Sequence, residues 1–265
     1  MGNEGSKGKP KSGPSKTIQG AISEIRGGPS SSTVTKHMEM ARKSRILQLK
    51  GANLKKVPDN IAELCDVLRN LELSQNRISS IPPFIGHFNQ LKQLHLSANN
   101  LDSLPDEIGS LNALEVLNLS ENSLGALPDS LSNCANLRTL NLDSNEFQRF
   151  PNVVISLLNL DILNLAKNKI AELPENIDEL NAAEVNLNQN QLASLAPNLS
   201  KCPRLKILRV EENCLPKTAF TKALLESSPV SIIAYSGNLF QESDFQSLPG
   251  YEDYQLRYTA TKRKM

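Results

Sequence analysis

Residues 68–82 read LRNLELSQNRISSIP, with leucine or isoleucine at five fixed places, one asparagine and a closing proline. The same spacing of apolar residues recurs four more times, in units that end at Pro105, Pro128, Pro151 and Pro174. The asparagines of the pattern recur almost every 23 residues, at positions 76, 99, 122, 145, 168, 190, 213 and 238. A fixed period of about 20 to 50 residues indicates that one structural unit is stacked many times.

The Leu-x-Leu part of each unit predicts a short strand, because its alternation leaves one apolar and one polar face. One unit cannot bury its apolar face alone, so we expect parallel strands stacked about 4.8 Å apart around a single core. The asparagine amide both donates and accepts hydrogen bonds and can satisfy loop backbone groups along the stack. We therefore interpret the periodic asparagines as structural. The apolar residues after each proline are expected to pack the opposite side as short helical turns.

This pattern resembles that of leucine-rich repeat proteins. The resemblance implies an α/β fold, a right-handed curved solenoid with a parallel β-sheet on its concave face and short helices or turns on its convex face. Composition and the spacing of apolar residues predict four segments: a disordered basic tether over 1–33, an N-terminal cap over 34–45, about nine repeats over 46–241, and a C-terminal cap with a basic tail over 242–265.

Several classes of function are not supported by the sequence. The three histidines and four cysteines show no metal-ligand spacing, and no phosphate-binding, hydrolase or kinase motif is present. We therefore predict no enzyme, no metal, no cofactor and no small-molecule substrate. The basic chain ends lack interleaved aromatic residues, so no nucleic acid is expected.

Location is predicted from what the chain lacks and from its cysteines. No apolar run is long enough for a membrane-spanning helix, and the start of the chain has no secretory signal. The cysteines show no CxxC motif and no regular framework, which is typical of a reducing compartment. We therefore expect a cytoplasmic protein.

The outward strand positions are expected to lie side by side on the concave face. One column of these positions is rich in amides, and its neighbour carries apolar residues in the middle of the sheet. Repeat scaffolds use such extended concave surfaces to bind partners, although any single position could simply be solvated. The predicted partner-binding residues are His95, Val116, Asn118, Thr139, Asn141, Ile162, Asn164, Asn186 and Arg209.

The chain opens with MGNEGS, which fits the N-myristoylation pattern with Gly2 as the acceptor after Met1 is removed. One myristoyl chain gives only marginal membrane binding, so a second signal is needed. A basic cluster can supply it, because each lysine near an anionic leaflet contributes about 1 kcal/mol. These lysines are Lys7, Lys9, Lys11 and Lys16.

The sequence thus predicts a scaffold for a protein partner of unknown identity, held at the membrane periphery by a lipid anchor. The alternative is a soluble regulatory subunit of a small-GTPase or phosphatase complex without membrane attachment. Charge is consistent with the first interpretation, since residues 1–45 carry +6 and residues 261–265 carry +3. Because the whole chain carries +1, the segment between them carries −8.

Overall fold

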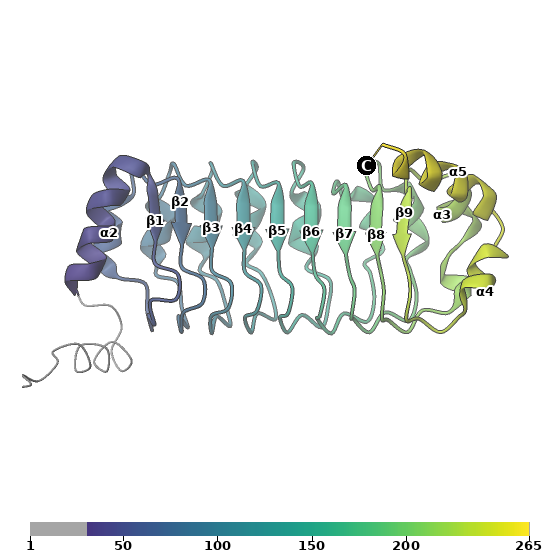
Figure 1. Cartoon of the computed structure of the whole chain (residues 1–265), viewed down its shortest axis with the longest axis horizontal. Helices are drawn as coiled ribbons and strands as arrows, with labels where there is room; N and C mark the ends of the chain where they lie inside the picture. Colours follow the sequence, from purple (N-terminus) through teal and green to yellow (C-terminus); the bar gives the residue numbers. More distant parts are fainter. Residues whose placement is uncertain (1–30, 265) are drawn as a thin grey trace, which may run out of the picture.

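The fold is built on one parallel sheet, seen in a computed structural model that describes residues 31–264. Its nine strands follow one another in chain order, as Figure 1 shows. The predicted solenoid with a parallel sheet along one face is confirmed. The strands are β1 (Ile46–Gln48), β2 (Asn70–Glu72), β3 (Gln93–His95), β4 (Val116–Asn118), β5 (Thr139–Asn141), β6 (Ile162–Asn164), β7 (Glu184–Asn186), β8 (Ile207–Arg209) and β9 (Ile232–Ala234).

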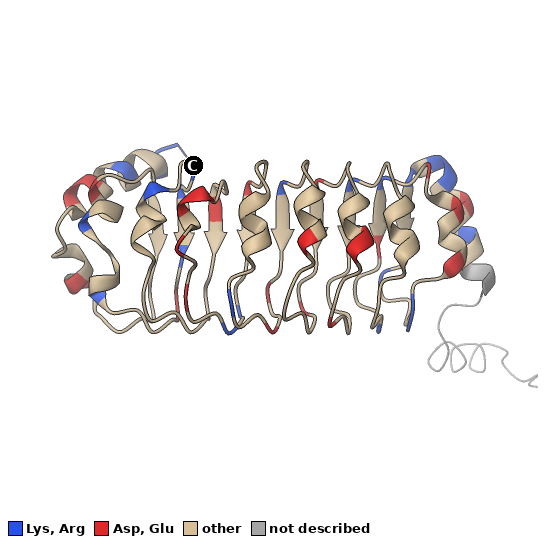
Figure 2. Cartoon of the chain, turned by 180° about the vertical axis from the view of Figure 1, so that it is seen from behind, with Lys and Arg blue, Asp and Glu red and all other residues tan. Residues whose placement is uncertain are grey.

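The opposite side is covered by short 3-10 helices, which lie in front of the strands in the reverse view of Figure 2. Most follow a proline, whose fixed φ suits the start of a helical turn. These helices confirm the short turns expected after the repeated prolines. They are η1 (Asp59–Leu64), η2 (Pro83–His87), η3 (Asp106–Ser110), η4 (Asp129–Asn133), η5 (Asn152–Ser156), η6 (Ile177–Glu179), η7 (Pro197–Lys201) and η8 (Lys217–Ala219).

The core runs the length of the stack between sheet and 3-10 helices. Inward strand leucines such as Leu117 and Leu140 are fully buried. Cys134 and Cys202 occupy core positions on the helical side, where their thiols donate hydrogen bonds to carbonyls of the preceding repeat. Burial raises the pKa of the Cys134 thiol to about 11 and that of Cys202 to about 12. Both cysteines therefore remain protonated thiols near neutral pH and serve as small apolar side chains.

The periodic asparagines form the expected ladder, of which Asn145 is typical. Its Nδ2 donates to the carbonyls of Leu119 (3.0 Å), Leu142 (3.1 Å) and Asp143 (3.3 Å). Its Oδ1 accepts from the backbone N–H of Leu124 at 2.9 Å. One buried side chain thus satisfies four backbone groups, two of them in the preceding repeat, and so links consecutive repeats.

The residue before each ladder asparagine adopts a left-handed backbone conformation that the sequence did not predict. In the repeat of Asn145 this residue is Ser144, with φ 56°. Its N–H donates to the carbonyl of Ala166 in the next repeat at 2.9 Å. The bond between repeats helps hold a conformation that is uncommon for residues other than glycine. The same conformation occurs at Gln75, Ala98, Glu121, Lys167, Gln189 and Glu212.

Helices lie at both ends of the stack (Figure 1). At the first repeat, α2 (Ser31–Ser44) buries Val34, Met38 and Ala41. Arg45, the last residue of the predicted cap, is exposed and follows the helix with φ 63°. A left-handed residue at the end of a helix breaks the helical repeat, so the stripe of buried residues stops at Ala41.

The C-terminal end carries α3 (Lys222–Glu226), α4 (Glu242–Gln246) and α5 (Tyr251–Lys262). Phe245 of α4 is fully buried within an aromatic cluster and stacks on Tyr235 with ring centroids 4.0 Å apart. The hydroxyl of Tyr254 in α5 accepts a hydrogen bond from the N–H of Ile233 at 3.0 Å. This N–H belongs to the last strand, so α5 satisfies part of the outer strand edge.

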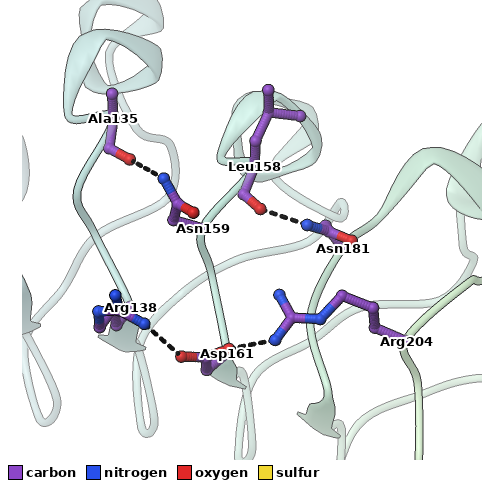
Figure 3. Close-up of polar contacts among 7 residues, drawn as sticks. All are labelled: Ala135, Arg138, Leu158, Asn159, Asp161, Asn181 and Arg204. Carbon is purple, nitrogen blue, oxygen red and sulfur yellow. Dashed lines mark hydrogen bonds and ion pairs between the residues drawn. The ribbon is translucent and has the colours of Figure 1, made fainter.

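A cluster of polar contacts holds the stack together where one repeat is short. The step from Asn168 to Asn190 is 22 residues, and η6 spans only three residues. Asp161 accepts hydrogen bonds from Arg138 (3.2 Å) and Arg204 (2.5 Å), as Figure 3 shows. Arg204 lies 43 residues along the chain from Asp161, so the pair of contacts spans the short repeat.

Side-chain amides reinforce the same edge of the stack. Asn159 donates to the carbonyl of Ala135 at 2.8 Å, and Asn181 donates to the carbonyl of Leu158 (Figure 3). The hydrogen bond from Arg204, aided by the one from Arg138, lowers the pKa of the Asp161 carboxyl. The cluster therefore favours an ionised Asp161, joined by charged hydrogen bonds to the preceding repeat and to the repeat beyond the short one.

Candidate protein-binding site

The predicted binding residues lie in two neighbouring columns on the exposed face of the sheet. The pairing register places Asn118 of β4 beside Asn141 of β5, and Asn141 beside Asn164 of β6. In the same column, the predicted residues run from His95 on β3 through Asn186 to Arg209 on β8. Val116, Thr139 and Ile162 pair in the adjacent column. The structure thus brings all nine predicted residues onto one face, while their role in binding stays a prediction.

The four central asparagines, here called the amide row, share one side-chain geometry. Each Oδ1 accepts a hydrogen bond from the backbone N–H two residues later, at 3.0 to 3.1 Å. These local bonds are Asx turns, which fix the side chain as the chain leaves the strand. The row consists of Asn118, Asn141, Asn164 and Asn186, whose N–H donors are Ser120, Asp143, Ala166 and Asn188.

The turn leaves the other half of each amide free. Within residues 31–264, no hydrogen bond is found for the Nδ2 groups of the four row members. Sequence reasoning identified these positions as polar but missed that the oxygen is already used. The recurrence of asparagine two residues before a loop is the signal that could have suggested it.

An apolar strip borders the amide row. Ile162 is 41% exposed at the centre of the sheet. Thr139 on the neighbouring strand and Val116 on the strand after it are half-buried. A partner that covers Ile162 would remove apolar area from water, and such area contributes about 25 cal/mol per Å². The strip is therefore the apolar part of the candidate surface.

Charged residues mark the β7–β8 end of the columns. Arg209, a predicted binding residue, forms an ion pair with Glu184, with Nε and Oε1 3.0 Å apart. Both side chains are partly buried. The guanidinium is thus already balanced by a carboxylate, which makes Arg209 a weaker candidate for attracting an anionic partner than its sequence position suggested.

The loops just beyond the amide row form a mostly acidic rim. In the loops after β4 to β8, this rim carries the carboxylates of Glu121, Asp143, Glu146, Glu211 and Glu212 and the ammonium groups of Lys167 and Lys169, of which Lys169 pairs with Glu146. Glu211 also accepts a hydrogen bond from Asn188 at 2.8 Å. The local field of the surface is therefore negative along one side of the amide row.

Two hollows lie away from these columns. One of about 610 Å³ is formed by the loops around Gly125 and Phe150. Another of about 310 Å³ lies at the C-terminal end, lined by all four tyrosines of the chain and Glu242. Among residues 31–264, no group of His, Cys, Asp and Glu side chains has the arrangement of a metal site.

The lipidation and membrane predictions concern other parts of the chain. Gly2, Lys7, Lys9, Lys11 and Lys16 lie outside the described residues. In the portion that the structure does describe, no helix has the length and apolar character required to span a bilayer.

Comparison with known proteins supports the repeat architecture. A family described as "Leucine rich repeat" matches residues 89–147, and one described as "Leucine Rich repeats (2 copies)" matches residues 67–109.

Similar solved structures include a leucine-rich repeat protein from Leptospira interrogans, 23% identical over 82% of this chain and 73% of that chain, with a TM-score of 0.58. Internalin C2 from Listeria monocytogenes is 18% identical over 77% of this chain and 92% of that chain, with a TM-score of 0.64. A TDR receptor is 26% identical over 77% of this chain but only 37% of its own length, with a TM-score of 0.62. The fold of this chain is therefore a curved leucine-rich repeat solenoid.

Proposed function

We propose that this chain is a non-enzymatic scaffold that binds a protein partner across the concave face of β4 to β7. The observation that carries this proposal is the pair of columns on that face, in which Ile162 is exposed beside free amide donors. Central apolar anchors surrounded by polar groups are typical of the energetically important part of protein interfaces. A broad open sheet face also suits a macromolecule better than a small ligand, which needs an enclosing pocket.

Substitutions on the concave face and away from it test this proposal. Ile162→Arg, combined with Asn141→Arg, places bulky charges on the concave face and should abolish recovery of the partner by the full chain. Leu158→Arg is the control. Leu158 is 68% exposed and lies in the repeat of Asn141, but outside the two columns. Circular dichroism should show that all variants keep the fold. Equal recovery by the concave and control variants would remove the central site from consideration.

We further infer that the scaffold is held at the cytoplasmic face of a membrane by N-myristoylation of Gly2 together with the lysine cluster. The support is the match of the first six residues to the acceptor pattern and the nearby Lys7, Lys9, Lys11 and Lys16. Gly2→Ala should move the protein from the membrane fraction to the soluble fraction, and salt should weaken the wild-type attachment. Membrane recovery that is unaffected by Gly2→Ala would refute the lipid anchor.

The second candidate is a soluble regulatory subunit of a small-GTPase or phosphatase complex. It is favoured if the wild-type chain is already soluble in cell fractionation and still recovers its partner. The concave-face variants apply to both candidates, whereas Gly2→Ala distinguishes them. Each part of the proposal can therefore fail separately.

Resemblance supports the non-enzymatic assignment. The segments at 186–191, 202–209, 211–215 and 237–240 are similar to those of leucine-rich repeat-containing protein 57. That kind of protein has no established catalytic activity, and the resemblance departs at the N-terminus, where this chain has a longer segment rich in Lys, Gly and Ser.

The four predicted segments are proposed with the boundaries given above, except that α2 begins at Ser31, inside the predicted tether. Limited proteolysis of the full chain tests them, because exposed and poorly ordered segments are cut first. The expected first cuts fall before residue 34 and leave a resistant product that includes 46–241. Early cleavage within 46–241 would contradict these boundaries.

A further inference from the structure

The amide row has a chemistry that its sequence alone does not reveal. Each Oδ1 already accepts a hydrogen bond from a backbone N–H two residues later, whereas neither Nδ2 hydrogen of any row member has a partner within residues 31–264. The groups that the row offers to a partner are therefore predominantly hydrogen-bond donors. The local turns also fix the side chains before binding, so less rotamer freedom is lost when a partner docks.

We infer that the amide row binds main-chain carbonyls of an extended, basic segment of the protein partner. This inference rests on the proposed docking of a protein on the concave face. It adds the chemical class of the contacting segment, which the proposed function leaves open.

The Nδ2 donors of the amide row favour a partner segment without regular secondary structure. Along a helix and within a sheet, main-chain carbonyls already accept hydrogen bonds from their own fold. An extended or polyproline-like segment has carbonyls without internal partners. Four neighbouring strands about 4.8 Å apart present donors over roughly 14 Å, which matches about four to five extended residues.

The charge of the surroundings selects for basic side chains in the segment. The rim carries five carboxylates against two lysines, as described above. Acidic side chains could also accept hydrogen bonds from the row, but they would approach Asp143 and Glu121, which repel them. Neutral carbonyls are not repelled by the acidic rim, and lysine or arginine side chains of the segment are attracted by it. The apolar strip at Ile162 provides a place for one aliphatic side chain of the segment.

Substitution of row asparagines by aspartate, which is nearly the same size, removes the Nδ2 donor but keeps the local bond that fixes the side chain. In Asn118→Asp with Asn164→Asp, each aspartate keeps an oxygen to accept the local backbone N–H but loses the outward donor. The two sites are on alternate strands, so the new carboxylates are about 9.6 Å apart rather than adjacent. Ile162→Arg serves as a separate variant that blocks the whole face.

The probe is a library of random twelve-residue peptides displayed on phage and selected against the full chain. We expect selected peptides to be rich in Lys, Arg, Pro and Gly and poor in Asp and Glu. By fluorescence anisotropy in 1 M salt, the double Asn→Asp variant should bind them at least about fivefold more weakly, since each lost hydrogen bond contributes roughly 0.5 to 1.5 kcal/mol. At this salt concentration the Debye length is about 3 Å, so the attraction between the new carboxylates and a basic peptide is screened and does not mask the loss.

A direct measurement on the unmodified chain accompanies the variants. In nuclear magnetic resonance spectra, the side-chain NH₂ signals of Asn118, Asn141, Asn164 and Asn186 should shift on peptide binding. Those of the buried ladder residue Asn145 should not. Unshifted row signals would overturn the inference even if a variant failed to fold.

The outcomes distinguish this inference from the proposed function. If Ile162→Arg abolishes peptide binding but the double Asn→Asp variant binds as well as wild type, the concave face is the site and the donor row is not. If neither variant changes binding, both proposals fail. Selection of helical or acidic peptides, or a loss that disappears in 1 M salt, would also overturn the donor role.

Discussion

Asn141 and Asn145 are four residues apart and carry the same side chain, yet they bond to different parts of the structure. Asn141 accepts one local N–H and its Nδ2 has no hydrogen-bond partner within residues 31–264, whereas Asn145 is 5% exposed and satisfies four backbone groups. The period of 23 residues is sufficient to predict the ladder role of Asn145. It cannot predict which atom of Asn141 is free, because that depends on the backbone path after the strand.

At this scale, substitution by aspartate should affect the two asparagines differently. Asn145→Asp replaces a donor to three carbonyls by an acceptor, so it should lower the free energy of unfolding by about 1 to 3 kcal/mol or more. Asn141→Asp keeps its single accepted bond and should stay within about 0.5 kcal/mol of wild type. Urea denaturation measures both. Equal loss at the two sites would contradict the assigned bonding.

Asp161 should make a pH-dependent contribution to stability. Its folded pKa is lowered, first by the hydrogen bond from Arg204, so the unfolded state binds a proton more readily. The contribution is therefore present above the unfolded pKa of about 3.9 and is lost as pH falls through the lower folded value. Because its side chain is about a third exposed, each ion pair should contribute no more than about 1 kcal/mol.

Urea midpoints of wild type and Asp161→Asn at pH 7, 5 and 3 test this contribution. The difference between the two proteins should be largest at pH 7 and 5 and smaller at pH 3. Arg204→Gln should reproduce most of the loss at pH 7. A difference that is constant across this pH range would show that the carboxylate charge is not responsible.

Successive 3-10 helices on the convex side pack closely against one another, and Gly86 and Gly109 permit this close approach. A Cβ on Gly109 would lie 2.2 Å from the carbonyl oxygen of Ser130, and one on Gly86 would lie 2.9 Å from that of Glu107. The sequence predicts a helical turn at each of these places from the proline and the apolar spacing. It does not show how closely successive turns approach, because that distance depends on the stacking of neighbouring repeats.

Alanine substitutions at two glycines should therefore give opposite results. Gly109→Ala forces backbone to move and should destabilise the protein by about 1 to 3 kcal/mol. Gly125→Ala is the control, because an added Cβ meets no atom within 4 Å there. It should be neutral or slightly stabilising, since alanine restricts the unfolded chain. Thermal unfolding compares the two, and a neutral Gly109→Ala would contradict the close packing.

The contact between α5 and β9 gives a prediction for the C-terminal end. Tyr254→Phe removes the only acceptor found within residues 31–264 for the N–H of Ile233. The buried N–H would then be unsatisfied, at a cost of about 1 to 3 kcal/mol. Amide hydrogen exchange at Ile233 should become faster. Tyr251→Phe, which removes only an exposed bond to Gln255, should leave that exchange unchanged; acceleration in both variants would point to a general loosening.

For the whole molecule, the regular period makes much of the candidate surface predictable. A step of 22 or 23 residues brings equivalent strand positions into register, so the columns containing Asn141 and Ile162 follow from counting along the chain. Long-range contacts such as Arg204 with Asp161 do not follow, because they cross the one short repeat. The identity of the partner is likewise not encoded in the period, since the repeated residues build the scaffold and the variable ones face outward.

The central claim is that a protein docks on the concave face of β4 to β7. The most direct test is to map which parts of the full chain its recovered partner shields from solvent. Hydrogen exchange reports on the backbone amides, and hydroxyl-radical footprinting reports on the side chains. We predict that Ile162, Val116 and the loops after the amide row become protected, while Leu158 and the convex 3-10 helices stay as accessible as in the free chain. Protection confined to the convex helices or to the ends of the stack would contradict the claim.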